Sequence, residues 1–271
     1  MTVGLDRDAA GRYVLGRLTP AGGYSFYRTP QWSVEEPNAP DTLAALESLR
    51  LLDIAAPRPN VTGRWLRSLQ AADGGYPTLT IGWAALRALA VLGIAPVRSF
   101  SEWLSSREHA LLGRRRDRDW RGALSDALHL FESVRLSELA PRFTGRDRFS
   151  KLLGGASVTP GQLSGCPDQH GDGRDRGAAE QFLRRNEDGV LGLRLSPDAG
   201  ATSVGALWGG LELADVLGLE LSYPGAVGEN LALMQRADGG LGARHAAIST
   251  LHDTWRGLEA TRLLDKLHEE R

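Results

Sequence analysis

The sequence predicts an all-α protein built from repeated helical hairpins. Two observations lead to this prediction: a short helical phrase recurs five times, and a glycine turn precedes most of its copies. No run of residues alternates strictly between polar and apolar, as an exposed strand would. One hairpin cannot bury its apolar face alone, so neighbouring hairpins must stack to share a core.

The recurring phrase occupies one slot in each of five predicted helices, which we call slot helices. The slot residue is apolar in every copy: Leu46, Leu86, Phe131, Leu211 and Leu258. The residue three positions earlier is leucine or tryptophan, with tryptophan at Trp83, Trp208 and Trp255. Most slots lie about 45 residues apart, which leaves room for two helices of mean length and two connections. The interval from Phe131 to Leu211 is nearly twice as long, so the sequence predicts five or six hairpins.

Local signals mark where the helices begin and end. The first slot helix runs from Asp41 to Asp53 with leucines at helical spacing. Asp41-Thr42 and Asp253-Thr254 are typical of helix starts, and Gly93 and Gly218 are typical of C-terminal caps. Four prolines are expected to end helices: Pro57, Pro59, Pro96 and Pro141. A second helix is expected before each of four glycine turns or connections, over Val61–Leu69, Phe100–Leu112, Gly177–Arg185 and Ala226–Gln235.

Two of the glycine turns carry a more specific motif. Gln70-x-x-Asp73-Gly74-Gly75-Tyr76 and Gln235-x-x-Asp238-Gly239-Gly240-Leu241 are each followed by an aromatic-marked helix. They resemble the prenyltransferase and squalene-oxidase repeat, which occurs in protein prenyltransferase β subunits and in class II terpene cyclases. The resemblance covers about Arg12 to Lys266, with a poor fit over residues 141–176.

This resemblance implies a single α/α-toroid domain over residues 1–271, with an inner and an outer ring of helices around a central cavity. Residues 141–176 would then be a loop-rich insertion or a lid over the cavity. The implied function is a diverged, cyclase- or transferase-like enzyme of natural-product (secondary) metabolism. It would bind a small, largely apolar or amphipathic intermediate and promote cyclisation, substitution or elimination. The alternative is a non-catalytic toroid subunit that completes the active site of a partner protein.

In the toroids that the chain resembles, the slot helices begin at the mouth of the cavity. The candidate acid–base residues are therefore those near two of these starts: Glu35, Glu36, Asp41, His252 and Asp253. The candidate substrate-binding residues combine an aromatic wall with polar side chains: Trp83, Trp208, Trp255, Asn38, Thr80, His129, Thr202 and His245. Asp41 and Asp253 are also ordinary helix caps, and the tryptophans also fill a repeated core position.

The motifs of the two resembled enzyme classes are incomplete. Class II cyclases use the acid of a D-x-D-D sequence, and Asn38-Ala39-Pro40-Asp41 keeps only its last aspartate. Prenyltransferases hold zinc with Asp-x-Cys and a later histidine. Here the cysteine lies in the reversed order Cys166-Pro167-Asp168, near His170. We therefore expect no cofactor. Zinc held by Cys166, Asp168 and His170 is the alternative to an exposed loop, and magnesium is an alternative without assigned ligands.

Composition excludes several other classes of protein. The net charge is −1, whereas a dedicated nucleic-acid binder needs a strong basic excess. The single cysteine, Cys166, excludes an internal disulfide. The charged N-terminal residues do not form a secretory signal, and the apolar stretch 81–97 is too short to cross a bilayer. The sequence therefore predicts a cytoplasmic protein without a transmembrane segment.

Overall fold

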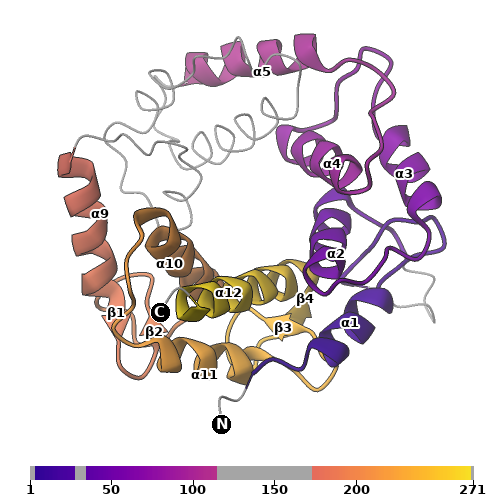
Figure 1. Cartoon of the computed structure of the whole chain (residues 1–271). Helices are drawn as coiled ribbons and strands as arrows, with labels where there is room; N and C mark the ends of the chain where they lie inside the picture. The colour runs from indigo at the N-terminus through magenta and orange to yellow at the C-terminus, as the bar shows by residue number, and fades with distance from the viewer. Residues whose placement is uncertain (1–3, 28–34, 115–172, 270–271) are drawn as a thin grey trace. The chain divides into compact units, whose positions relative to one another are not determined.

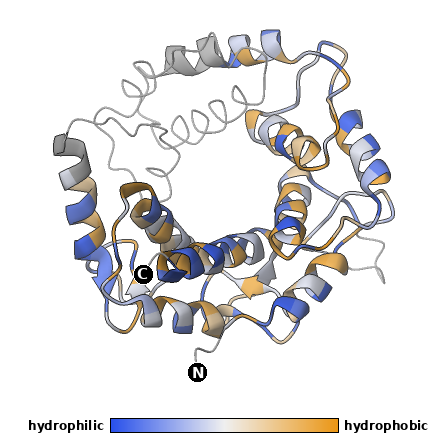
Figure 2. Cartoon of the chain, viewed as in Figure 1, coloured by the Kyte–Doolittle hydropathy of each residue, from blue (hydrophilic) through white to orange (hydrophobic). Residues whose placement is uncertain are grey.

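The computed structural model describes residues 4–27, 35–114 and 173–269, and these are predominantly helical (Figure 1). The helices are α1 (Arg7–Leu15), α2 (Ala39–Leu51), α3 (Pro59–Ser68), α4 (Leu79–Val91), α5 (Ser101–Arg114), α9 (Gly173–Asn186), α10 (Val204–Leu217), α11 (Pro224–Met234) and α12 (Leu251–Glu269). The predicted all-α class is confirmed at this level. Figure 2 shows that α10 is mostly hydrophobic whereas α9 is mostly hydrophilic.

Two pairs of very short antiparallel strands interrupt the helical pattern, and the sequence did not indicate them. The pairs are β1 (Glu187–Asp188) with β2 (Gly192–Leu193), and β3 (Leu241–Gly242) with β4 (Ser249–Thr250). Each strand has two residues. The first pair encloses the Gly189 turn, and the second lies between the Gly239 turn and α12. Runs this short leave no alternation in the sequence.

The predicted second helices are present, with small shifts at their ends. The structure has them as α3, α5, α9 and α11. Helix α9 begins at Gly173, inside the region predicted to be an insertion. Pro59 was expected to end a helix, but it opens α3 at a first-turn position, where its missing N–H is not needed. Helix α1 was not predicted, because no glycine turn precedes it, although Asp6 caps its start.

The described slot helices α2, α4 and α10 end in the same way. Asp53, Gly93 and Gly218 follow them with φ values of 58°, 68° and 61°. The next amide then donates back into the last turn of the helix, for example from Ile94 to the carbonyl of Leu89 at 2.9 Å. The caps predicted at Gly93 and Gly218 are confirmed, and Asp53 adopts the same left-handed conformation without being glycine.

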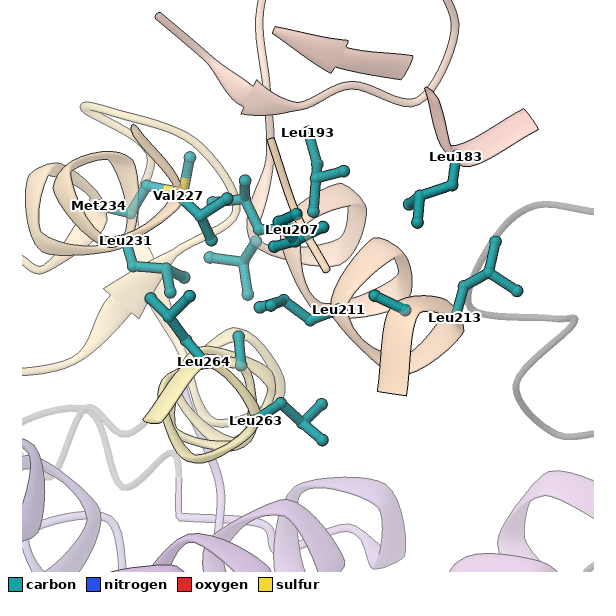
Figure 3. Close-up of a cluster of buried hydrophobic side chains, with 14 of the residues drawn as sticks. Leu183, Leu193, Leu207, Leu211, Leu213, Val227, Leu231, Met234, Leu263 and Leu264 are labelled. Atoms are coloured by element: carbon teal, nitrogen blue, oxygen red, sulfur yellow. The ribbon is translucent and has the colours of Figure 1, made fainter. Parts of the chain in front are cut away.

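The chain divides into two compact units, and the boundary falls inside α2. The first unit comprises Met1–Gly16, Ser48–Ala55 and Val158–Arg271. The second comprises Arg17–Glu47 and Ala56–Ser157. The first unit has a continuous core of leucines from α9, β2, α10, α11 and α12 (Figure 3). Leu207 and Leu211 of α10 lie at its centre and are fully buried.

In the second unit, three residues of the Gln70 motif contact the segment that begins the next hairpin. The Gln70 side chain donates to the carbonyls of Gly74 at 2.8 Å and Arg98 at 3.0 Å, and it accepts from the amide of Arg98 at 2.9 Å. Gly74 has a φ of 84°, and a Cβ there would collide with the carbonyl of Ser99 just before α5. A Cβ on Gly75 would collide with Trp103 of α5. The motif is therefore a joint between one hairpin and the next.

The first unit repeats this joint between the last glycine turn and the first helix of the chain. The Gln235 side chain donates to the carbonyl of Asp6 at 2.8 Å and accepts from the amide of Asp6 at 2.8 Å. Gly239 has a φ of 91°, and a Cβ there would collide with the carbonyl of Ala9 in α1. A Cβ on Gly240 would collide with the Tyr13 ring. The last turn thus holds α1 as the Gln70 turn holds α5.

Candidate functional site

The first predicted mouth residues form a local cap at the start of α2. The carboxylate of Asp41 accepts from the Asn38 amide group at 2.7 Å and from the backbone amide of Phe26 at 2.9 Å. The amide of Asp41 donates in return to the Asn38 side chain at 2.8 Å. Thr42 accepts from the amide of Tyr24 at 2.9 Å. Asn38 and Asp41 are therefore brought together, and their bonds fix the glycine turn to the helix.

The last slot helix begins with the same arrangement. Thr250 donates to the Asp253 carboxylate at 2.7 Å and accepts from the Asp253 amide at 2.9 Å. The buried hydroxyl of Thr254 accepts from the amide of Leu241 at 3.0 Å and donates to the carbonyl of Thr250 at 2.6 Å. Both Asp-Thr pairs thus tie a glycine turn to a helix start. The structure gives Asp41 and Asp253 this structural role, and catalysis by either stays a prediction.

The other predicted polar residues that the structure describes differ in their burial. Thr202 is buried and donates to the carbonyl of Leu193 across the β2 connection. His245 and Glu36 are exposed, whereas Glu35 and Thr80 are partly buried. The remaining predicted residues, His129, Cys166, Asp168 and His170, lie outside the described part of the chain. Within the described part, no group of three or more His, Cys, Asp or Glu side chains is arranged to hold a metal ion.

The predicted aromatic wall is brought together in part. Helices α10 and α12 of the first unit lie side by side (Figure 1) and carry Trp208 and Trp255. The guanidinium carbon of Arg256 lies 3.6 Å from the centre of the Trp208 ring and 4.1 Å from that of the Trp255 ring. We call Trp208, Trp255 and Arg256 the tryptophan–arginine cluster. Trp83, the third predicted tryptophan, is buried on α4 in the second unit.

Charged residues extend the cluster along one face of α12. The Glu259 carboxylate lies 3.8 Å from Arg256 and 3.7 Å from Arg262, both longer than a hydrogen bond. One turn further, Lys266 forms a 2.6 Å ion pair with Asp215 of α10. The exposed His252 meets the Trp255 ring edge-on, with ring centres 6.1 Å apart. Of the predicted residues, His252 therefore lies beside the cluster.

Arg256 was missed by the sequence reasoning, although a signal was present. It stands two positions before the slot residue Leu258. The other described slot helices have Ala44, Ala84 and Gly209 at that position. An arginine among small residues in a repeat marks a unit that differs from its neighbours. Its contact with Trp208, however, depends on how α10 packs against α12.

The arrangement has the parts of a site for an amphipathic small molecule. Two indole rings offer apolar surface, and a guanidinium held against them offers hydrogen-bond donors. The side chain of Arg256 is 15% exposed, so it reaches solvent while its position is fixed by the rings.

The interpretation of the tryptophan–arginine cluster as a binding site rests on the structure alone. No family model matches the chain, and the search of curated proteins gave no match. None of the described helices has both the length and the apolar character that crossing a membrane requires.

Proposed function

We propose that the chain is a diverged α/α toroid of the prenyltransferase and terpene-cyclase type, and that it binds a largely apolar or amphipathic biosynthetic intermediate. The tryptophan–arginine cluster carries the binding part of this proposal. It places two predicted wall tryptophans on adjoining helices, with polar side chains beside them. The chemistry proposed for the bound intermediate is cyclisation, substitution or elimination.

The toroid part is supported by the joints between hairpins. Gln70 binds the segment that precedes α5, and Gln235 binds the segment that precedes α1 with equivalent bonds. A row of hairpins whose last turn holds its first helix has no free end. Such a row is what a closed ring requires.

A non-catalytic subunit is the second candidate, and one observation favours it. The two aspartates predicted as acids, Asp41 and Asp253, already accept hydrogen bonds within helix caps. A toroid whose acids serve as caps can still bind a ligand or complete another protein's site. We therefore keep binding and turnover as separate proposals with separate readouts.

The experiment titrates the purified chain with geraniol, farnesol and geranylgeraniol and follows tryptophan fluorescence and calorimetric heat. Saturable binding of at least one alcohol is expected, weakened about tenfold or more in Trp208→Leu, because a buried aromatic contact contributes roughly 1.5–3 kcal/mol. Trp65→Leu, a tryptophan of α3 outside the cluster, is the matched control and should bind normally. Absence of saturable binding at every chain length would refute the proposal.

Turnover is tested separately by incubating the chain with the corresponding prenyl diphosphates and analysing products by mass spectrometry. A new product that depends on Asp253 or His252 supports the enzyme. Binding without any product favours the non-catalytic subunit.

A further inference from the structure

We infer that the tryptophan–arginine cluster recognises a single carboxylate group on the ligand. This inference rests on the proposed function and adds the polar group that the apolar molecule carries. Three features of the described residues support it: the fixed guanidinium, the charge balance of the α10–α12 face, and a second hydrogen-bond donor on Trp208.

The position of Arg256 suits recognition of a planar anion. At 3.6 Å and 4.1 Å from the two ring centres, its guanidinium lies against aromatic surface and is restrained there. A guanidinium presents N–H donors in a flat fork that matches the two oxygens of a carboxylate. Because the rings already restrain the side chain, binding loses less rotational freedom than it would with a free arginine.

The surrounding charges favour a ligand with one negative charge. Arg256 and Arg262 share Glu259, and Lys266 is paired with Asp215. Glu212 follows Trp208 by one helical turn. Among the described residues, these basic and acidic groups are equal in number. A diphosphate would add about three negative charges at neutral pH, and the described residues around the cluster offer no surplus of basic groups to balance them. A carboxylate adds one.

A second donor lies in the same cluster. The indole N–H of Trp208 is buried and has no hydrogen-bond acceptor within the described part of the chain. A buried donor left without an acceptor is unfavourable, and an oxygen atom of the ligand would remove this cost. Trp208 thus offers both apolar contact and a donor beside the Arg256 guanidinium.

The test compares three ligands that share one apolar tail: farnesol, farnesoic acid and farnesyl diphosphate. Calorimetry at neutral pH should show farnesoate binding at least about tenfold tighter than farnesol, since a charge-assisted hydrogen bond contributes roughly 1.5–3 kcal/mol. Arg256→Gln should abolish this preference, so that farnesoate and farnesol bind with affinities within about threefold of each other. Lys266→Gln removes a positive charge from the same helix face and should keep the preference.

Arg256→Lys tests whether recognition needs the planar guanidinium or only a positive charge. It also provides a second variant if Arg256→Gln fails to fold. Lysine keeps the charge but lacks the planar fork, so the preference for farnesoate should fall to about threefold or less. A purely structural Arg256 would change stability but leave the ratio of the two affinities unchanged.

The outcomes separate this inference from the function on which it rests. Equal affinities of the wild type for farnesol and farnesoate would overturn the carboxylate site while the apolar site stands. Tighter binding of farnesyl diphosphate than of farnesoate would overturn the choice of a single-charge ligand. Absence of binding of all three ligands would refute the proposed function, and the inference with it.

Discussion

Replacing Gly239 with alanine tests whether the last glycine turn holds the first helix. Gly239 combines a φ of 91° with a position where a Cβ would collide with the Ala9 carbonyl of α1. Gly218 lies in the same unit with a φ of 61°, and a Cβ there would meet no atom within 4 Å. Gly218→Ala therefore measures backbone strain alone, and Gly239→Ala measures strain plus the collision.

The magnitudes follow from these two environments. A left-handed alanine should lower the free energy of unfolding by about 1–2 kcal/mol in Gly218→Ala. In Gly239→Ala the collision adds about 1–3 kcal/mol. Separation of the turn from α1 would also break both hydrogen bonds between Gln235 and Asp6, at roughly 0.5–1.5 kcal/mol each. We expect Gly239→Ala to be less stable than Gly218→Ala by about 2–6 kcal/mol.

Urea unfolding followed by circular dichroism measures the difference, and hydrogen exchange locates it. The amides of Asp6 and Ala10 should exchange faster in Gly239→Ala and remain protected in Gly218→Ala. Equal stabilities of the two variants, with α1 protected in both, would show that α1 does not pack on the last turn. The support for a closed ring would then be lost.

Three further predictions concern buried polar groups. Thr254→Val should lower the free energy of unfolding by about 1–3 kcal/mol in urea titrations, because a buried amide loses its acceptor. Arg87→Met should lower it by about 3 kcal/mol, because the buried Glu47 loses its 3.0 Å ion pair, and adding Glu47→Gln should restore part of the loss. Burial raises the pKa of the Tyr24 and Tyr76 hydroxyls to about 12 each. Their contribution to stability is complete below about pH 10 and should fall as the pH rises toward 12, by about 1.4 kcal/mol per pH unit per tyrosine.

Each of these predictions has its own control. The Thr261 hydroxyl donates to the Gly257 carbonyl within α12. Thr261→Val should therefore lower the free energy of unfolding less than Thr254→Val does. Absorbance of tyrosinate follows the two tyrosines directly, and Tyr24→Phe with Tyr76→Phe should flatten the loss of stability at high pH. Ordinary titration near pH 10 in the folded protein would contradict their burial.

The hairpins were predictable because their signals are local. Gln70 and Gln235 bond to the glycine turns in their own motifs, and Gly93 and Gly218 end helices through their own backbone conformations. Helix α1 was missed because its start, capped by Asp6, lacks a preceding glycine turn. Its place becomes evident only through the bonds to Gln235.

The candidate site was less predictable because it depends on contacts between helices. The sequence places Trp208 and Trp255 at equivalent positions, but only the packing of α10 against α12 brings Arg256 to both rings. The sequence left Asp253 open to two interpretations, because an aspartate at a helix start can be part of a cap or an acid. The Thr250 hydroxyl donates to the Asp253 carboxylate at an oxygen–oxygen distance of 2.7 Å, and this hydrogen bond makes Asp253 part of a helix cap.

The bond between Gln235 and Asp6 also constrains how the protein is made. The two residues are 229 positions apart, so α1 leaves the ribosome long before the turn that receives it. The early contacts of α1, such as the bond from Arg7 to the carbonyl of Leu51, can form soon after the helix is made. Its contacts with Gly239 and Gly240 can form only when nearly all of the chain has been synthesised, so α1 reaches its final packing late.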